Sequence, residues 1–104
     1  MFDKIKKILG IGPKVDFGEL IANGAVIVDV RSSGEYSFGH LNKSVNMPLD
    51  TLKVKLGKLK KDTPVITCCA SGMRSSMAKK ILLANGFKQV HNGGSWFNLK
   101  RYEE

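Results

Sequence analysis

Two apolar runs, each rich in β-branched residues, constrain the fold of this chain more than any other feature. The run AVIVDVR covers residues 25–31, and the run TPVITC covers residues 63–68. Uninterrupted apolar runs are typical of strands that are covered on both faces, as in parallel sheets. Parallel strands need crossover connections, which place helices on the faces of the sheet. We therefore expect an α/β domain of three layers, with a small, mostly parallel central sheet flanked by helices on both faces.

The segments outside these runs include several helical patterns. Apolar spacing and terminal glycines predict helices at residues 16–24, 50–61 and 75–87, and another at the end of the chain. The first of these begins with Asp16 and Glu19, which match a capping box. In the helix at 75–87, the residues expected to share one face are Met77, Ile81 and Leu82.

Extended patterns are shorter and less regular. Residues 44–49 predict a short strand that ends at Pro48, and residues 88–91 predict an edge strand. The glycine pair that follows residue 91 is interpreted as a turn. Residues 32–44 are expected to form a loop with one helical turn around Glu35 and Tyr36.

The length of 104 residues fits one compact domain. We expect residues 15–104 to form this domain and residues 1–14 to form a short N-terminal helix and a linker. The apolar side chains of the first segment fall at helical spacing, at Phe2, Ile5, Ile8 and Leu9. A short helix docked on the domain is the expected structure, and a membrane-surface anchor is the alternative.

The apolar runs, the N-terminus and the cysteines of the chain indicate the cellular compartment. No run approaches the ~18 apolar residues of a membrane span, and the N-terminus lacks the apolar segment and cleavage site of a signal peptide. The two cysteines are adjacent, and a bond between neighbouring cysteines strains the peptide that joins them. We therefore expect both thiols to be reduced and the protein to be cytoplasmic.

The formal net charge is +8, and lysines are dense at residues 53–61. A nucleic-acid site would interleave aromatic or arginine side chains with the basic ones, and this segment has neither. The lysines are therefore interpreted as a solvated helix face, and no nucleic-acid partner is expected. Such a charge attracts small anions over long range. We expect a monomer.

The segment CASGMR, residues 69–74, joins the second apolar run to the helix that follows it. In open α/β sheets, sites form in loops beyond the carboxyl ends of the strands, where Asp29 and Cys69 are both predicted. Gly72 can take backbone angles that other residues avoid, so the loop can turn its N–H groups inward as an anion-binding nest. The following helix N-terminus and Arg74 add positive charge. The predicted anion-binding loop is Ala70, Ser71, Gly72, Met73, Arg74 and Ser75.

A thiol at the base of such a nest should ionise readily, because the N–H groups and the positive charge favour the thiolate. Cys69 has that position and is the predicted nucleophile. Cys68 should point the other way and fill the core, because strand side chains alternate. A zinc site built from Cys68, Cys69, His40 and His91 is not expected, since zinc-binding cysteines are usually two to four residues apart. No metal or other cofactor is predicted.

Three segments in order resemble the rhodanese-like sulfurtransferase family, in its single-domain form. Residues 26–49 resemble the family's strand with Asp–x–Arg, a Glu–Tyr helical turn and a Gly–His pair. Residues 69–76 (CASGMRSS) resemble its active-site loop, and residues 92–99 (NGGSWFNL) resemble its C-terminal Gly–Gly segment with a following Trp. The resemblance covers nearly the whole chain after residue 15, so it implies a rhodanese-like domain there.

The resemblance implies a reaction and its residues. The Cys69 thiolate would take a sulfane sulfur from a small anion such as thiosulfate, hold it as a persulfide, and pass it to cyanide or a thiol. A thioredoxin-like protein would be one such thiol partner. Asp29 and Arg31 would support the fold near the loop, and His40 would be structural. From the residues themselves, the buried Asp29 carboxylate is expected to pair with Arg31, with loop N–H groups or with Arg74, and Glu35 is expected to pair with Arg31.

The chain also departs from the family pattern. The family often has a Pro–Gly pair after Gly–His, which GHLNKS lacks, and Met73 stands where polar residues are frequent. Position 73 lines the site that chooses the sulfur donor in this family. Trp96 and Phe97 are interpreted as core or pocket wall.

Other functions remain open at this stage. A carrier or docking module would hold persulfide, or a partner, with little turnover. A phosphatase or arsenate reductase would use the same nest, but related phosphatases have one more residue between cysteine and arginine than the four found between Cys69 and Arg74. A redox role for the adjacent thiols is a third alternative.

Overall fold

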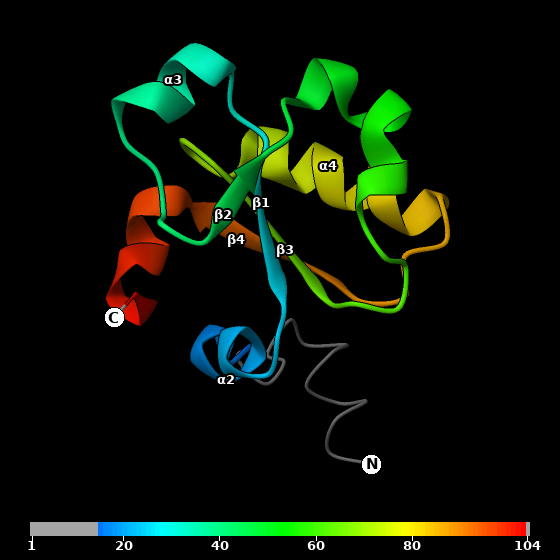
Figure 1. Ribbon diagram of the computed structural model, residues 1–104, viewed down its shortest axis with the longest axis horizontal. Helices are drawn as coiled ribbons and strands as arrows, with labels where there is room; N and C mark the ends of the chain where they lie inside the picture. The colour runs from blue at the N-terminus through cyan, green and yellow to red at the C-terminus, as the bar shows by residue number, and fades with distance from the viewer. Residues whose placement is uncertain (1–14, 104) are drawn as a thin grey trace, which may run out of the picture.

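Four parallel strands form the central sheet, in the spatial order β2-β1-β3-β4 (Figure 1). The computed structural model describes residues 15–103, so the helix expected within residues 1–14 lies outside the described residues. The strands are β1 (Val26–Asp29), β2 (Ser44–Asn46), β3 (Val65–Cys69) and β4 (Val90–Ser95). Every pairing is parallel, which confirms the sheet type predicted from the two apolar runs.

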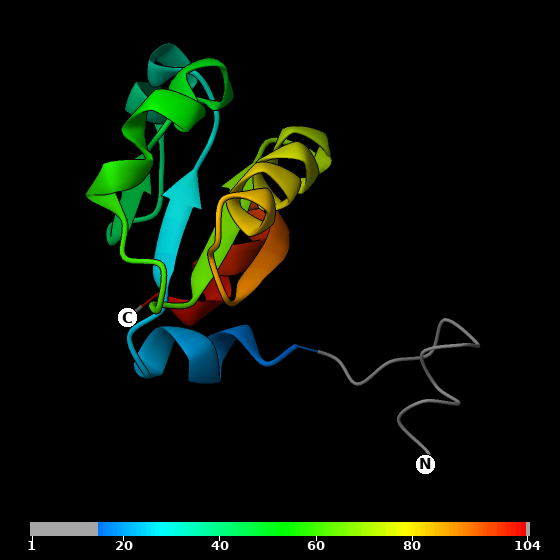
Figure 2. The same cartoon turned by 90° about the vertical axis from the view of Figure 1, so that its right-hand side faces the viewer.

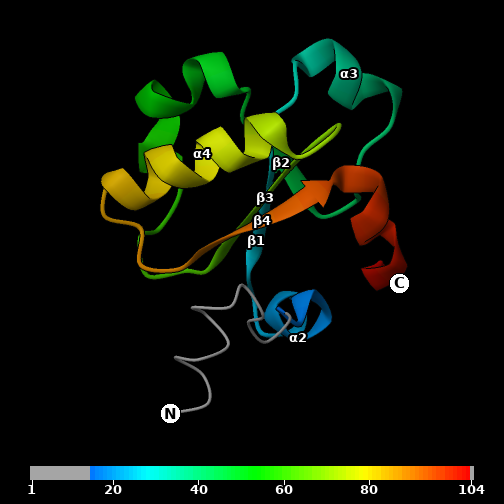
Figure 3. The same ribbon diagram turned by 180° about the vertical axis from the view of Figure 1, so that it is seen from behind.

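Helices cover both faces of the sheet and complete three layers. One face packs against η1 (Leu49–Lys58) and α4 (Met73–Ala84), around Val28, Val65 and Leu82. The other face packs against α2 (Phe17–Ala22) and η2 (Trp96–Tyr102), around Ile27, Ile66 and Leu99. Figure 3 shows β4 running directly into η2. Within residues 15–103, no helix is both long enough and apolar enough to cross a bilayer.

The two ends of the sheet differ. Figures 1 and 2 show α3 (Ser33–Phe38) beyond the carboxyl end of β1 and α2 near the opposite end. The Ser32 side chain accepts from the backbone N–H of Glu35, and the Glu35 carboxylate accepts from the backbone N–H of Ser32. This reciprocal capping box stabilises a short helix where one helical turn was expected. Asp29 and Cys69 are the last residues of β1 and β3. Both lie at carboxyl ends, as predicted, although the second strand was expected to end one residue earlier, at Cys68.

Residues 50–61 do not form the expected α-helix. The segment is a 3-10 helix over Leu49–Lys58, begun by a hydrogen bond from the Thr51 N–H to the Pro48 carbonyl at 3.0 Å. Thr51, Val54 and Gly57 all have low helix propensity, which weakens the competing α-helix. The predicted apolar side still faces the core, because Leu52 is buried and Leu56 and Leu59 pack against it.

The helix expected at residues 75–87 is α4, which begins at Met73 and ends at Ala84. Its buried side chains are Ser75, Ala78 and Leu82. Met77 is 56% exposed, so its place on the buried face was predicted wrongly. Gly86 follows the helix with φ +91°, as the predicted stop requires.

The C-terminal edge strand extends further than residues 88–91. Strand β4 includes Asn92, Gly93 and Gly94, which the sequence suggested were a turn. Thr67 pairs with Asn92 and Cys69 pairs with Ser95, so β4 holds one extra residue at this point, a β-bulge. A Cβ on Gly93 would lie 2.9 Å from both the Ile66 and Leu99 side chains, so only glycine fits there.

Candidate active site

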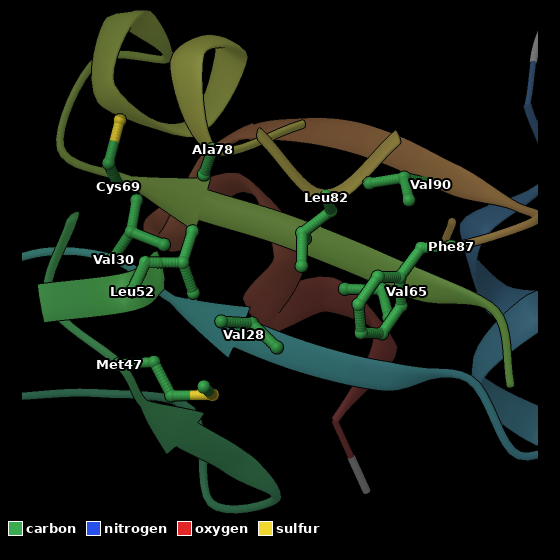
Figure 4. Packing of buried hydrophobic residues seen from close by; sticks show 10 residues of the cluster. All are labelled: Val28, Val30, Met47, Leu52, Val65, Cys69, Ala78, Leu82, Phe87 and Val90. Atoms are coloured by element: carbon green, nitrogen blue, oxygen red, sulfur yellow. The ribbon is translucent and has the colours of Figure 1, made fainter. Parts of the chain in front are cut away.

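The two adjacent cysteines point to opposite faces of β3. Cys68 packs in the cluster of Ile27 and Ile66, and Cys69 packs in the cluster of Val30 and Ala78. Both residues have no exposed surface, and neither forms a disulfide. Figure 4 shows the Cys69 sulfur directed toward the turn that leads into α4. Strand alternation therefore gives the neighbouring thiols different surroundings.

Cys69 lies at the base of a cradle made by residues 69–75. The Gly72 N–H donates to Sγ at 3.0 Å, and the Ser75 N–H donates at 3.4 Å. The Ser75 hydroxyl oxygen also lies 3.4 Å from Sγ. Gly72 has φ +107°, a conformation that β-carbon-bearing residues rarely adopt and that turns its N–H inward. The loop forms the nest expected from its sequence.

These contacts determine the protonation of the two thiols. Burial opposes ionisation of Cys69, but hydrogen bonds from the Ser75 hydroxyl and from loop N–H groups outweigh it and lower the pKa of Cys69. Burial, with the nearby charge of Asp29, raises the pKa of Cys68 to about 12. At neutral pH Cys68 is therefore a protonated thiol, and Cys69 is the more acidic one.

Arg74 of the loop forms an ion pair with Glu35 of α3. Its guanidinium donates to both oxygens of Glu35, at 2.6 and 3.0 Å. The expected pair between Glu35 and Arg31 is therefore wrong, because α3 docks its first turn over the loop and brings Glu35 to Arg74. The hydrogen bond from Arg74, helped by the Ser32 N–H, lowers the pKa of Glu35 to about 2.

Asp29 and Arg31 form a buried ion pair beside the loop. The Arg31 Nη2 lies 2.7 Å from Asp29 Oδ2 and also donates to the Gly39 carbonyl at 2.7 Å. The guanidinium lies 4.6 Å from the centre of the Trp96 ring. Asp29 and Arg31 are 0% and 5% exposed, so their charges are almost wholly desolvated. The pair ties β1, the end of α3 and η2 together.

The remaining predicted residues fall into two groups. His40 is exposed, stacks on the Tyr36 ring, and places its Nδ1 2.6 Å from the Tyr36 carbonyl, so its contacts belong to α3. Ala70 and Ser71 are exposed loop residues, and Met73, the first residue of α4, is 78% exposed. Trp96 is half-buried as a wall residue, whereas Phe97 is 64% exposed and is not part of the core.

One residue of the cradle was missed by the sequence analysis. Asn92 accepts a hydrogen bond from the Ser75 hydroxyl at 2.6 Å and donates to the Gly72 carbonyl at 3.1 Å. Its only sequence signal is its place before the glycine pair, which had been interpreted as a turn.

Two cavities lie away from the loop on the described part of the molecule. Cavities of about 420 Å³ and 610 Å³ are lined by other segments, and neither includes a residue of the loop 69–75. Within residues 15–103, no three His, Cys, Asp or Glu side chains come together in a group that could hold a metal ion.

Comparison with known proteins agrees with this geometry. The family model described as "Rhodanese-like domain" matches residues 14–99. The Thiosulfate sulfurtransferase GlpE of Ectopseudomonas mendocina is 32% identical over 83 residues, covering 80% of this chain and 76% of that protein. The structure described as "rhodanese with anions from E. coli" superposes with a TM-score of 0.68 at 28% identity, covering 72% of this chain and 91% of that one.

Other relatives are less informative about activity. The Uncharacterized protein YqhL of Bacillus subtilis is 34% identical over 68 residues, 65% of this chain, and this match spans 54% of the length of YqhL. The tRNA uridine(34) hydroxylase of Buchnera aphidicola is 31% identical over 83 residues, with 73% of this chain and 27% of that protein covered. Relatives of this domain thus include both a sulfurtransferase and larger proteins with another activity. On the match over residues 14–99, the chain belongs to the family of rhodanese-like domains.

Proposed function

We propose that this protein is a sulfurtransferase that carries a sulfane sulfur on Cys69. The observation that carries the proposal is the cradle: N–H groups of Gly72 and Ser75 converge on the Cys69 sulfur. Such donors stabilise a negatively charged sulfur, whether it is a thiolate or a persulfide. The similarity to a thiosulfate sulfurtransferase supports the same function.

The reaction has two displacement steps. In the first, the Cys69 thiolate attacks the outer sulfur of thiosulfate, an S–S bond forms, and the S–S bond of thiosulfate breaks. The bonding electron pair leaves with sulfite. In the second, a nucleophile such as cyanide or a thiolate attacks the terminal persulfide sulfur, and the Cys69 thiolate leaves. The lowered pKa of Cys69 raises the share of thiolate that is ready to attack.

The loop length favours sulfur over phosphoryl transfer. Four residues separate Cys69 from Arg74, and Arg74 is held by Glu35 rather than free to clamp a tetrahedral anion. A phosphatase or arsenate reductase would also use a thiolate in a nest, so hydrolysis of an aryl phosphate is a useful counter-assay. A protein that loads sulfur but turns over cyanide no faster than a free thiol would instead be a carrier.

Mass spectrometry of the intact protein tests the proposal. Incubation with thiosulfate should add the mass of one sulfur atom, and a reductant should remove it. Cys69→Ser should abolish the adduct, and the matched variant Cys68→Ser should retain it. An adduct that survives in Cys69→Ser, or no adduct with any of several sulfane donors, would refute the proposal. Ping-pong kinetics with thiosulfate and cyanide should accompany the adduct.

A further inference from the structure

We propose that Asn92 is a positioning residue of the cradle, which holds the Ser75 hydroxyl ready for the sulfur anion and anchors Gly72 beneath it. The inference rests on the proposed function, since it takes Cys69 as the reacting group. Its test, however, measures the thiol itself and does not require sulfur transfer.

Asn92 touches the cradle at each polar atom of its side chain. Its Oδ1 accepts from the Ser75 hydroxyl at 2.6 Å and from the Gly94 N–H at 2.9 Å. Its Nδ2 donates to the Gly72 carbonyl at 3.1 Å. Asn92 pairs with Thr67, and the bulge in β4 lies between this pair and the pair of Cys69 with Ser95. The edge strand is thereby joined to the nest through one carboxamide.

The Ser75 hydroxyl has one hydrogen and two neighbours. When Cys69 is a thiol, its S–H donates to the Ser75 oxygen at 3.4 Å, and the Ser75 hydrogen goes to Asn92 Oδ1. When Cys69 loses its proton, the sulfur can only accept. Rotation of the hydroxyl then turns the hydrogen toward the sulfur, while Asn92 Oδ1 keeps the Gly94 N–H. The switch moves one hydrogen, and the Ser75 and Asn92 oxygens, 2.6 Å apart while that hydrogen lies between them, then move apart.

The second contact of Asn92 fixes the backbone. Gly72 donates the shortest hydrogen bond to Sγ, 3.0 Å, from a left-handed conformation. The Nδ2 of Asn92 holds the carbonyl of this same residue. Ser75 is fully buried, so water cannot easily take the place of the Asn92 side chain as the partner of its hydroxyl.

The charge of residue 92 matters because other charges near Cys69 are balanced. Arg74 from α4 is paired with Glu35 from α3, and Asp29 is paired with Arg31 at the end of β1. The Cys68 thiol, on the opposite face, is protonated at neutral pH. A neutral amide at residue 92 adds no charge to this set. A carboxylate there would hold the Ser75 hydrogen more strongly and would also repel the thiolate.

The pH dependence of Cys69 alkylation tests the proposal. Iodoacetamide modification of wild type and Asn92→Asp, followed by intact mass, should show the midpoint of the rate–pH curve move upward by about one pH unit. That shift slows alkylation roughly tenfold below the midpoint. The matched control is Asn85→Asp, which makes the same charge change at the far end of α4, where the Asn85 amide contacts the Ile81 carbonyl. The control midpoint should stay at the wild-type value.

A second variant keeps the proposal testable if Asn92→Asp folds poorly. Ser75→Ala removes the hydroxyl and should also raise the midpoint. Adding Asn92→Asp to Ser75→Ala should then raise it less than in wild type, because only direct charge repulsion remains. A folded Asn92→Asp or Ser75→Ala protein with an unmoved midpoint would overturn the inference. Absence of sulfur transfer, with these shifts present, would refute the proposed function alone.

Discussion

Cys68 and Cys69 share a strand and almost nothing else in their surroundings. Loop N–H groups and the Ser75 hydroxyl favour the ionised form of Cys69, whereas the apolar pocket of Cys68 opposes it. Alkylation of the native protein between pH 6 and pH 9 should therefore modify one residue. The midpoint of the rate–pH curve should lie below that of a free cysteine, about 8.5. Peptide mapping that finds Cys68 modified first would contradict this assignment.

The buried pair of Asp29 and Arg31 should matter to stability more than any exposed pair. Asp29→Asn leaves the Arg31 guanidinium desolvated without its counter-charge, so the free energy of unfolding should fall by about 3–5 kcal/mol. The matched control is Asp62→Asn, because Asp62 pairs with Lys88 while 82% of its side chain is exposed. That change should alter stability by less than about 1 kcal/mol. Urea titrations compare the two, and equal losses would disprove the ranking.

The pair of Glu35 and Arg74 is a weaker contributor with a defined pH range. The pKa of Glu35 is lowered to about 2, so its carboxylate takes up a proton at lower pH in the folded state than in the unfolded state. Its contribution is therefore complete above about pH 4.5 and disappears as the pH falls toward about 2. The side chains are 37% and 39% exposed, so Glu35→Gln should lower stability by less than about 1 kcal/mol. A difference between wild type and variant that persists at pH 2 would contradict this range.

At the scale of elements, the bulge of β4 has no room for a side chain at Gly93. A Cβ on Gly93 would lie 2.9 Å from Ile66 and Leu99 and 3.1 Å from the Thr67 carbonyl. Gly93→Ala should therefore lower the free energy of unfolding by about 1–3 kcal/mol through overpacking. Gly57→Ala is the matched control, since a Cβ there meets nothing within 4 Å. Chemical denaturation in which Gly93→Ala is as stable as Gly57→Ala would show that the core yields at this point.

The helices and strands that could be predicted are those whose form is determined by the residue pattern within the segment itself. Strands β1 and β3 are continuous apolar runs, and α4 ends where Gly86 supplies a left-handed conformation. Strand β4 could not be predicted in full, because two consecutive glycines normally indicate a turn. They remain in the strand here because β4 pairs with β3 on both sides of them, with Thr67 opposite Asn92 and Cys69 opposite Ser95. That pairing has no local signal.

In the candidate site too, contacts between residues close in sequence could be predicted, and contacts between distant segments could not. Apart from Asn92, the cradle around Cys69 is formed by the consecutive residues 69–75, so its spacing is visible in the sequence. The partner of Glu35 was predicted wrongly because the nearest arginine in sequence is Arg31, whereas docking of α3 brings up Arg74. Asn92 was missed for the same reason, since it reaches Ser75 only through the register of β4 against β3.

At the scale of the whole molecule, the net charge of +8 should act on the rate of loading. A positive molecule attracts the doubly charged thiosulfate anion, and salt screens this attraction because the Debye length falls from about 10 Å at 0.1 M to about 3 Å at 1 M. The rate of persulfide formation from thiosulfate should therefore decrease severalfold over that range. Alkylation by uncharged iodoacetamide should change little. Equal salt dependence of both reactions would exclude long-range steering.

The opposed directions of the Cys68 and Cys69 side chains affect how long a loaded sulfur would stay. A sulfane sulfur on residue 69 cannot be expelled by the neighbouring thiol, because the backbone of β3 stands between the two sulfur atoms. Under the proposed function, the chain therefore has no second thiol that can take the sulfur from Cys69. The lifetime of the persulfide then depends on external nucleophiles that reach residue 69 at the loop, and the identity of this acceptor determines where the sulfur goes.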